Sequence, residues 1–201
     1  MSQSNLVKAL ILSAGRSSRM GAFKPLLPLR GRTVLECTVE SVLQGGAEEA
    51  VVVTGNRAEE LESLLARRFP HRVRWVRNEN WAATDMLSSV QLGAAALGSC
   101  GAFFLLPGDM PFVAPETFAA LLEERQRQPS PVLFPTHKGR RGHPPLIDAA
   151  LLPAILSYDG PEGLRGLWSR YDAQVRTVPV QDSGIAKDLD TPEDYQRFSN
   201  P

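Results

Sequence analysis

The sequence lacks the features that would place the chain in a membrane or hold it together with cross-links. It has 201 residues and only two cysteines, Cys37 and Cys100, whose spacing fits neither a disulfide framework nor a zinc cluster. No apolar run approaches the roughly 18 residues of a membrane span. The apolar stretch at residues 9–12 meets polar residues too soon to be a secretory signal. We therefore expect a cytoplasmic protein with no membrane contact.

The chain also lacks an excess of either charge, because 22 Lys and Arg balance 22 Asp and Glu. Nucleic-acid-binding proteins usually carry a basic excess, so we expect no nucleic-acid partner. The net charge of zero nevertheless hides an uneven distribution of charge along the chain. Residues 1–35 contain six basic residues and no acid, whereas residues 182–194 contain five acids and one lysine. Since charges of both signs usually alternate along a chain, this segregation marks both segments as candidate functional regions.

What the sequence does contain is a regular alternation of strand and helix patterns. Strand patterns occur at residues 6–13, 50–54, 73–76, 102–106 and 131–134, with helix patterns at 33–43, 58–69, 86–97 and 115–125. Such alternation forms βαβ units, which predicts a mostly parallel sheet covered by helices on both faces. We therefore expect an α/β protein with a Rossmann-like three-layer α/β/α fold, in a single domain that spans residues 1–201.

The alternation of strand and helix patterns ends after residue 135. Residues 137–143 form a basic, glycine-containing segment that predicts a hairpin. Helices are expected near residues 148–156 and 161–170, then a strand at 175–180 and a short helix at 192–198. Trp75 and Trp168 lie in apolar periodic segments, so we expect both side chains in the core.

The loop that follows the first strand is the first candidate site. Between Ser13 and Lys24 it combines small residues with the cations Arg16, Arg19 and Lys24. Small residues let backbone N–H groups approach a ligand, and cations neutralise phosphate charge, so the loop suits a polyphosphate. It is neither a P-loop nor a dinucleotide-binding fingerprint, because the required glycine spacings are missing. A solvated basic turn is the alternative interpretation.

Two acidic strings are the second and third candidates. Asp109 follows the strand at 102–106 in the turn Pro107-Gly108-Asp109, where a carboxylate at a strand end can hold Mg²⁺. Asp190 precedes Thr191, which is the expected cap of the terminal helix, and is itself not needed for capping. Asp190 is therefore a candidate for a second metal carboxylate. A simple turn is the alternative for Asp109.

Taken together, these segments resemble the MobA-like nucleotidyltransferases, and among them most closely the molybdenum cofactor cytidylyltransferase branch. The similarity runs over about residues 7–198. The strings that carry it are Leu12-Ser13-Ala14-Gly15 with Arg19-Met20-Gly21 and Lys24, Asn78-Glu79-Asn80-Trp81-Ala82, Pro107-Gly108-Asp109-Met110-Pro111, Arg141-Gly142-His143-Pro144-Pro145, and Asp188-Leu189-Asp190-Thr191-Pro192-Glu193-Asp194.

The resemblance implies a nucleotide-diphospho-sugar transferase-like fold and a Mg²⁺-dependent enzyme. Its reaction would transfer a nucleotidyl group from a nucleoside triphosphate, with CTP favoured, to the phosphate of a pterin cofactor. It also implies transient contact with a molybdoenzyme or its chaperone. The resemblance implies that Leu12, Ser13, Ala14 and Gly15 bind the base and ribose, and that Arg19 and Lys24 bind the phosphates. It implies that Asp109 and Asp190 bind Mg²⁺, and that the catalytic residues are Lys24, Arg19 and Asp109. Asn78 and Ser88 would lie at the substrate end of the site, and His143 near the acceptor.

The chain departs from the family pattern at Thr84-Asp85, where the family usually has glycine. Asp85 is either the N-cap of the helix at 86–97 or a charge that reshapes the acceptor site. Three functions therefore stay open. The first is a cytidylyltransferase. The second is a nucleotidyltransferase that takes GTP as the donor, or a sugar phosphate or other small phosphate as the acceptor. The third is a non-catalytic protein that binds and delivers the cofactor.

Overall fold

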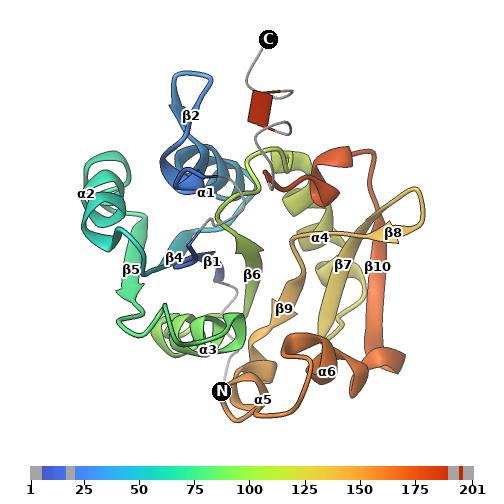
Figure 1. The fold of residues 1–201 in the computed structure, drawn as a ribbon. Helices are drawn as coiled ribbons and strands as arrows, with labels where there is room; N and C mark the ends of the chain where they lie inside the picture. Colours follow the sequence, from blue (N-terminus) through green and yellow to red (C-terminus); the bar gives the residue numbers. More distant parts are fainter. Residues whose placement is uncertain (1–5, 17–20, 190–194, 197–201) are drawn as a thin grey trace.

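A computed structural model describes residues 6–16, 21–189 and 195–196, and the described part is organised around a mixed sheet of eight strands (Figure 1). The strands lie side by side in the order β10–β7–β9–β6–β1–β4–β5, and β8 pairs with β7. Their bounds are β1 Val7–Ser13, β4 Glu49–Thr54, β5 Val73–Arg77, β6 Ala102–Pro107, β7 Val132–His137, β8 Arg140–Arg141, β9 Leu146–Asp148 and β10 Val175–Pro179. A separate small hairpin joins β2 (Pro28–Leu29) to β3 (Arg32–Thr33).

Helices cover both faces of the sheet, which confirms the predicted three-layer architecture (Figure 1). Alternate strand residues point to opposite faces, so that Ile11 of β1 packs with one group of helices and Leu10 with the other. The first group is α1 Val34–Gln44, α2 Ala58–Arg68 and α4 Pro115–Arg127, and the second is α3 Met86–Ala96, α5 Leu152–Leu156 and α6 Leu164–Ser169.

The sheet is parallel from β6 through β1 and β4 to β5, as expected, but it contains an antiparallel strand that the sequence pattern did not reveal. Strand β9 lies between β6 and β7 and is antiparallel to both. With three residues directly after Pro144-Pro145, it is too short to show alternation. The helix expected at 148–156 consequently begins later, because Asp148 ends β9 and caps the 3-10 turn η2 (Ala149–Leu151).

The remaining local predictions have mixed outcomes. The hairpin expected at 137–143 is present as the β7–β8 pair. Trp75 was wrongly expected in the core, because β5 is an edge strand and leaves this side chain 40% exposed. Of the helix predicted at 192–198, only residues 195–196 lie in the described part. Within the described ranges, no helix has both the length and the apolar character needed to cross a bilayer.

The fold places the carboxyl ends of β1, β4 and β6 next to one another, because these strands are parallel neighbours. In open α/β sheets, ligands bind in the crevice outside these ends. The backbone N–H of Gly108 donates to the Leu12 carbonyl over 2.8 Å, which ties the loop after β6 to the end of β1. The first two candidate segments of the sequence therefore meet at one edge of the sheet.

Candidate functional site

Two adjoining cavities open at this edge of the sheet. The small cavity has a volume of about 510 Å³ and the large cavity about 1180 Å³. They share a wall, because Leu12, Met86, Pro107 and Asp188 line both. The small cavity is further lined by Ser13, Ala14, Gly15, Lys24, Pro25, Trp81, Thr84, Asp85, Ser89, Gly108 and Asp109.

An ion pair between Lys24 and Asp109 lies in the small cavity. The Lys24 Nζ is 3.0 Å from Asp109 Oδ2, and the two side chains are 8% and 22% exposed. Lys24 begins the short 3-10 helix η1 (Lys24–Leu26), and Asp109 follows β6. The Leu189 N–H donates to the Asp109 carbonyl over 3.3 Å, which brings the acidic segment of the sequence to the same place. Three segments far apart in the chain therefore converge here.

The loop after β1 forms another part of the wall of the small cavity and leaves room for a ligand. The Ser13 Oγ is buried and has no hydrogen-bond partner among the described residues. A Cβ added at Gly15 would meet no atom of the described residues within 4 Å, so none of these residues requires a glycine at this position. A Cβ added at Gly108 would instead lie 3.1 Å from Ser13 Oγ. Gly108 thus permits close packing of the two loops, and Gly15 keeps space open.

The side chains that line the small cavity carry a net negative charge, so binding of a polyphosphate there requires a cation. Among the described residues that line it are three carboxylates, Asp85, Asp109 and Asp188, and one lysine, Lys24. This net negative lining would repel a polyphosphate unless a cation came between them. The described residues hold no group of three potential metal-ligating side chains, so a metal here would also need oxygens from its ligand. Mg²⁺ prefers such sites, with one or two carboxylates completed by phosphate oxygens and water.

Asp85 is the N-cap of α3, which was one of its two expected roles. Its Oδ1 accepts hydrogen bonds from the Ser88 N–H and the Ser88 hydroxyl, both over 2.9 Å. These two bonds hold the pKa of Asp85 below its ordinary value, since both favour the carboxylate. Asp85 also lines the small cavity.

Replacing Asp85 with alanine should therefore lower the free energy of unfolding by about 1 kcal/mol, because α3 loses its cap. Urea denaturation measures this loss, and Asp159→Ala, at an exposed aspartate outside both cavities, is the matched control. Glycine is also tolerated as an N-cap, so Asp85→Gly should change turnover little. A sharp rise in the turnover of Asp85→Gly would show instead that the carboxylate obstructs the site.

Asn78 and Ser88, expected at the substrate end, do not line either cavity. The Asn78 side chain is buried beneath the small cavity, where its Nδ2 donates to Thr84 Oγ1 and Ser89 Oγ over 3.0 and 3.1 Å. Ser88 is turned toward Asp85 by its capping bonds, and Ser89, one position later, lines the cavity instead. The helical register of α3 decides between the two serines, and the sequence alone did not reveal it.

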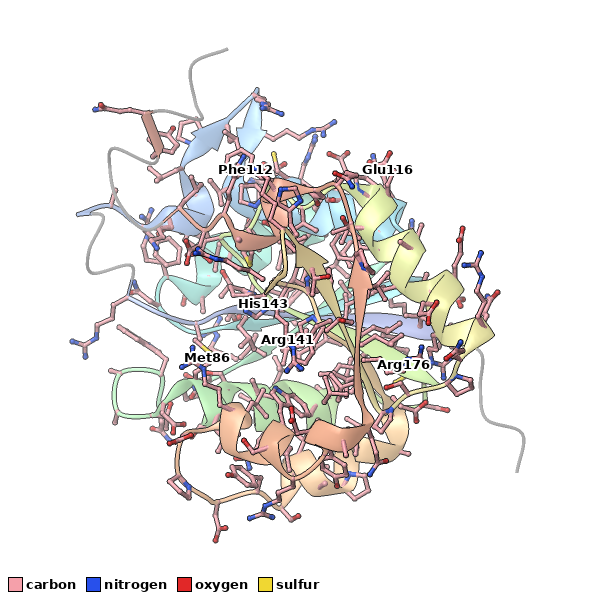
Figure 2. All side chains as sticks on the ribbon, turned by 90° about the vertical axis from the view of Figure 1, so that its right-hand side faces the viewer. Met86, Phe112, Glu116, Arg141, His143 and Arg176 are labelled. Atoms are coloured by element: carbon pink, nitrogen blue, oxygen red, sulfur yellow. The ribbon has the colours of Figure 1, made fainter. Side chains whose placement is uncertain are left out.

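His143 lines the large cavity and lies near the centre of the molecular face shown in Figure 2. Its ring is accessible from the cavity, yet the surrounding protein desolvates it and lowers the pKa of His143 below its ordinary value. A hydrogen bond with the Leu105 backbone partly offsets this effect. The imidazole is therefore neutral at pH 7 and offers a hydrogen bond, but no charge, to a ligand.

The basic segment of the sequence does not act as one unit. Lys8 lies at the other end of β1, where its Nζ binds the Leu97 carbonyl over 2.9 Å and Glu49 over 3.1 Å. Arg16 lies over the Trp81 ring, 5.3 Å from its centroid. Of the described cations in this segment, Lys24 alone lines the small cavity. Arg19 and Asp190, both predicted site residues, lie outside the described part of the chain.

Sequence reasoning missed several residues of the two cavities. Asp188 lines both, although the sequence favoured its neighbour Asp190. Trp168, expected in the core, is half-buried: it packs against the core and also lines the large cavity together with Arg165. The strings around Asp188 were visible in the sequence, but nothing in the pattern of α6 distinguished Arg165 and Trp168 from the residues of an ordinary surface helix.

The fold and the paired cavities at the strand ends define a nucleotidyltransferase with a Rossmann-like α/β/α architecture. The chain belongs to the family of the MobA-like NTP transferase domain, which matches residues 9–175. Enzymes of this family use nucleoside triphosphates and depend on a metal ion.

Two relatives in sequence are named for different functions. The chain is 33% identical over 199 residues to a nicotine blue oxidoreductase of Paenarthrobacter nicotinovorans, with 96% of each chain covered. It is 28% identical over 191 residues to the molybdenum cofactor cytidylyltransferase of Escherichia coli K12, covering 94% of this chain and 93% of the relative.

Solved structures agree with the fold. A nucleotidyl transferase from Methanothermobacter superposes with a TM-score of 0.79 and 30% identity, covering 98% of this chain and 97% of that one. Rv0371c from Mycobacterium tuberculosis, solved as a complex with manganese, superposes with a TM-score of 0.75 and 25% identity, covering 96% of this chain and 98% of that one.

Proposed function

We propose that the protein is a Mg²⁺-dependent cytidylyltransferase that transfers CMP from CTP to the phosphate of a molybdopterin-type cofactor and releases pyrophosphate. The observation that carries this proposal is the Lys24–Asp109 pair, which lies in a cavity sized for a nucleotide and next to a larger cavity for a second substrate. The cytidylyltransferase relative supports the choice of donor and acceptor.

In the proposed mechanism the donor nucleotide occupies the small cavity. Leu12, Ala14 and Gly15, which line the small cavity, face the base and ribose, and the unpartnered Ser13 Oγ gains a hydrogen-bond partner from the ligand. Such a gain is favourable, because a buried polar atom without a partner costs free energy. We also keep Arg19 as a proposed ligand of the terminal phosphates.

Chemistry then takes place at the α-phosphorus. An oxygen of the acceptor phosphate forms a bond to it while the bond to the bridging oxygen breaks, and pyrophosphate leaves. The acceptor is already ionised, so no protein nucleophile is required. The Lys24 ammonium stabilises the charge that grows on the α-phosphate. Asp109, Asp188 and Asp190 would hold Mg²⁺, which supplies charge neutralisation between the phosphates and the carboxylates.

Incubation of the protein with CTP, Mg²⁺ and molybdenum-loaded pterin cofactor tests the proposal directly. We expect release of pyrophosphate that requires all three components. Parallel reactions with GTP, ATP and UTP identify the preferred donor, and preference for GTP would correct the assignment to a guanylyltransferase. If no triphosphate yields pyrophosphate with this acceptor, the protein is not a cytidylyltransferase of this kind.

Reduction of a dye-like aromatic compound is the second candidate function. The nicotine blue oxidoreductase relative favours it, as does the apolar lining of the large cavity, which includes Phe134 and Trp168. Mixing the protein with the dye and a reduced nicotinamide cofactor distinguishes the two functions. We expect no loss of the dye's colour, because the lysine and carboxylates of the small cavity favour phosphate chemistry.

A further inference from the structure

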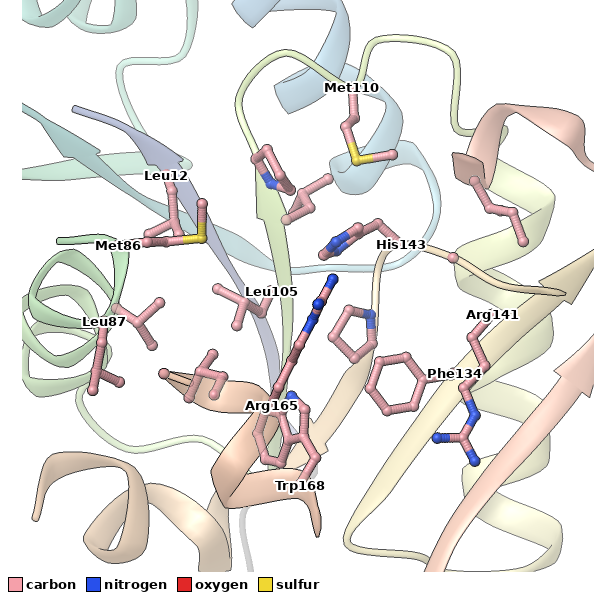
Figure 3. A pocket seen from close by; sticks show the side chains of 18 of the residues that line it. Leu12, Met86, Leu87, Leu105, Met110, Phe134, Arg141, His143, Arg165 and Trp168 are labelled. Atoms are coloured by element: carbon pink, nitrogen blue, oxygen red, sulfur yellow. The ribbon is translucent and has the colours of Figure 1, made fainter. Parts of the chain in front are cut away.

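The large cavity contains features that donor binding does not use. It lies on the far side of the shared wall from the Lys24–Asp109 pair, and aromatic and aliphatic side chains form most of its surface. Figure 3 shows Phe134 and Trp168 on one side of this space and Leu105 and Met86 on the other. Two aromatic rings in one cavity wall suit a ligand with a planar ring.

A ligand that carries a phosphate into this cavity also needs a cation, and two arginines line it. Arg141 is already engaged, because its guanidinium lies over the Phe134 ring, 5.6 Å from the centroid, and pairs with Asp172 over 3.9 Å. The Arg165 guanidinium has no ion pair or hydrogen bond with any described residue. In Figure 3 it extends from α6 toward His143, into the middle of the cavity.

Arg165 and Trp168 lie on the helix α6, which packs against the core. Leu167 is buried with 1% exposure and anchors the helix on the core, and Arg170 lies over the Tyr158 ring at 4.9 Å. Leu164, Arg165 and Trp168 of the same helix line the large cavity, and Leu164 and Trp168 also pack against the core. Positions three and four apart share a helix face, so Arg165 and Trp168 are held side by side.

We propose that Arg165 and Trp168 form the acceptor-recognition site, in which Trp168 and Phe134 contact a planar ring and Arg165 binds the phosphate of the acceptor. This inference rests on the proposed function, and it adds the residues that select the acceptor. A guanidinium binds phosphate through two parallel hydrogen bonds, so Arg165 also orients the attacking oxygen toward the small cavity.

Steady-state kinetics give the first test. We expect Arg165→Met to raise the KM for the acceptor by roughly 10- to 100-fold, since a charge-assisted bidentate contact is lost. The KM for CTP should change less than about twofold, because Arg165 does not line the small cavity. Arg67→Met, at an exposed arginine of α2 outside both cavities, is the matched control and should behave as wild type. Equal KM values for the acceptor in Arg165→Met and wild type would overturn the proposal.

A binding test without turnover separates this inference from the proposed function. Flavin mononucleotide, a planar ring with a phosphate monoester, should bind with quenched fluorescence, and riboflavin should bind about tenfold more weakly. Arg165→Met should remove this difference, and Trp168→Leu should remove the quenching. CTP should not displace the flavin.

The outcomes of the two assays are distinguishable. Arg165-dependent flavin binding without pyrophosphate release from any triphosphate would reject the proposed function and retain the recognition site. Pyrophosphate release that does not depend on Arg165 would retain the proposed function and reject the recognition site. Absence of flavin binding, equal binding of flavin mononucleotide and riboflavin, or displacement of the flavin by CTP would overturn the recognition site.

Discussion

Replacing Asp109 with asparagine should reduce the rate of nucleotidyl transfer by roughly 10³-fold, because the site loses a carboxylate proposed to hold the metal ion. Asparagine keeps the size of the side chain and an oxygen that can accept from the Lys24 ammonium, which lies 3.0 Å from Asp109 Oδ2. The variant should therefore fold, and its circular dichroism spectrum should match that of wild type. Pyrophosphate release at increasing Mg²⁺ concentrations measures the effect.

The matched control is Asp159→Asn, which changes an exposed aspartate outside both cavities and should leave the rate unchanged. Two results would contradict the role given to Asp109. A variant that fails to fold would show that the carboxylate is structural, which was the alternative interpretation of its turn. A folded variant with normal turnover would place the metal ion elsewhere.

Replacing Lys24 with alanine should lower kcat by roughly 10²- to 10³-fold while changing the KM for the donor by less than about tenfold. The reason is that the ammonium stabilises the charge on the α-phosphate most strongly when that charge grows in the transition state. Initial rates over a range of CTP concentrations, at saturating acceptor, separate the two parameters.

Arg67→Ala, an exposed cation on α2, controls for the removal of a positive charge and should have no effect on kcat. An increase in the KM for CTP with an unchanged kcat would make Lys24 an anchor for the bound donor only. Because the Lys24 side chain is largely buried beside Asp109, the unfolding midpoint of each variant should be measured before its rate is interpreted.

The three-layer fold was predictable because its signal is repeated along the chain. Buried strands such as β1 and β6 appear as continuous apolar runs, and helices such as α1 carry a recognisable cap. In α1, Thr33 Oγ1 accepts from the Glu36 N–H over 3.2 Å and Glu36 Oε2 accepts from the Thr33 N–H over 2.7 Å. The antiparallel β9 could not be foreseen, because three residues are too few to show a hydrophobic alternation and one of its two partners, β6, is remote in the sequence.

The candidate site was predictable where the residues follow strands directly. Ser13, Gly15 and Asp109 do so, and parallel neighbours bring strand ends together. The choice of Ser89 over Ser88 depends on the register of α3, and the positions of Arg165 and Trp168 depend on how α6 packs against Tyr158. Such tertiary contacts leave no trace in a single sequence.

The residues of the small cavity and the proposed acceptor residues lie on different elements of the fold, and this separation affects how the protein could evolve. The small cavity is lined mainly by the ends of β1 and β6, whereas the proposed acceptor residues are on α6. Substitutions at distant, independent positions have nearly additive effects. A lineage could therefore exchange residues on α6 and adopt a new acceptor while its use of the donor stayed intact. Relatives that are named for different activities and share one fold are the outcome that such a separation permits.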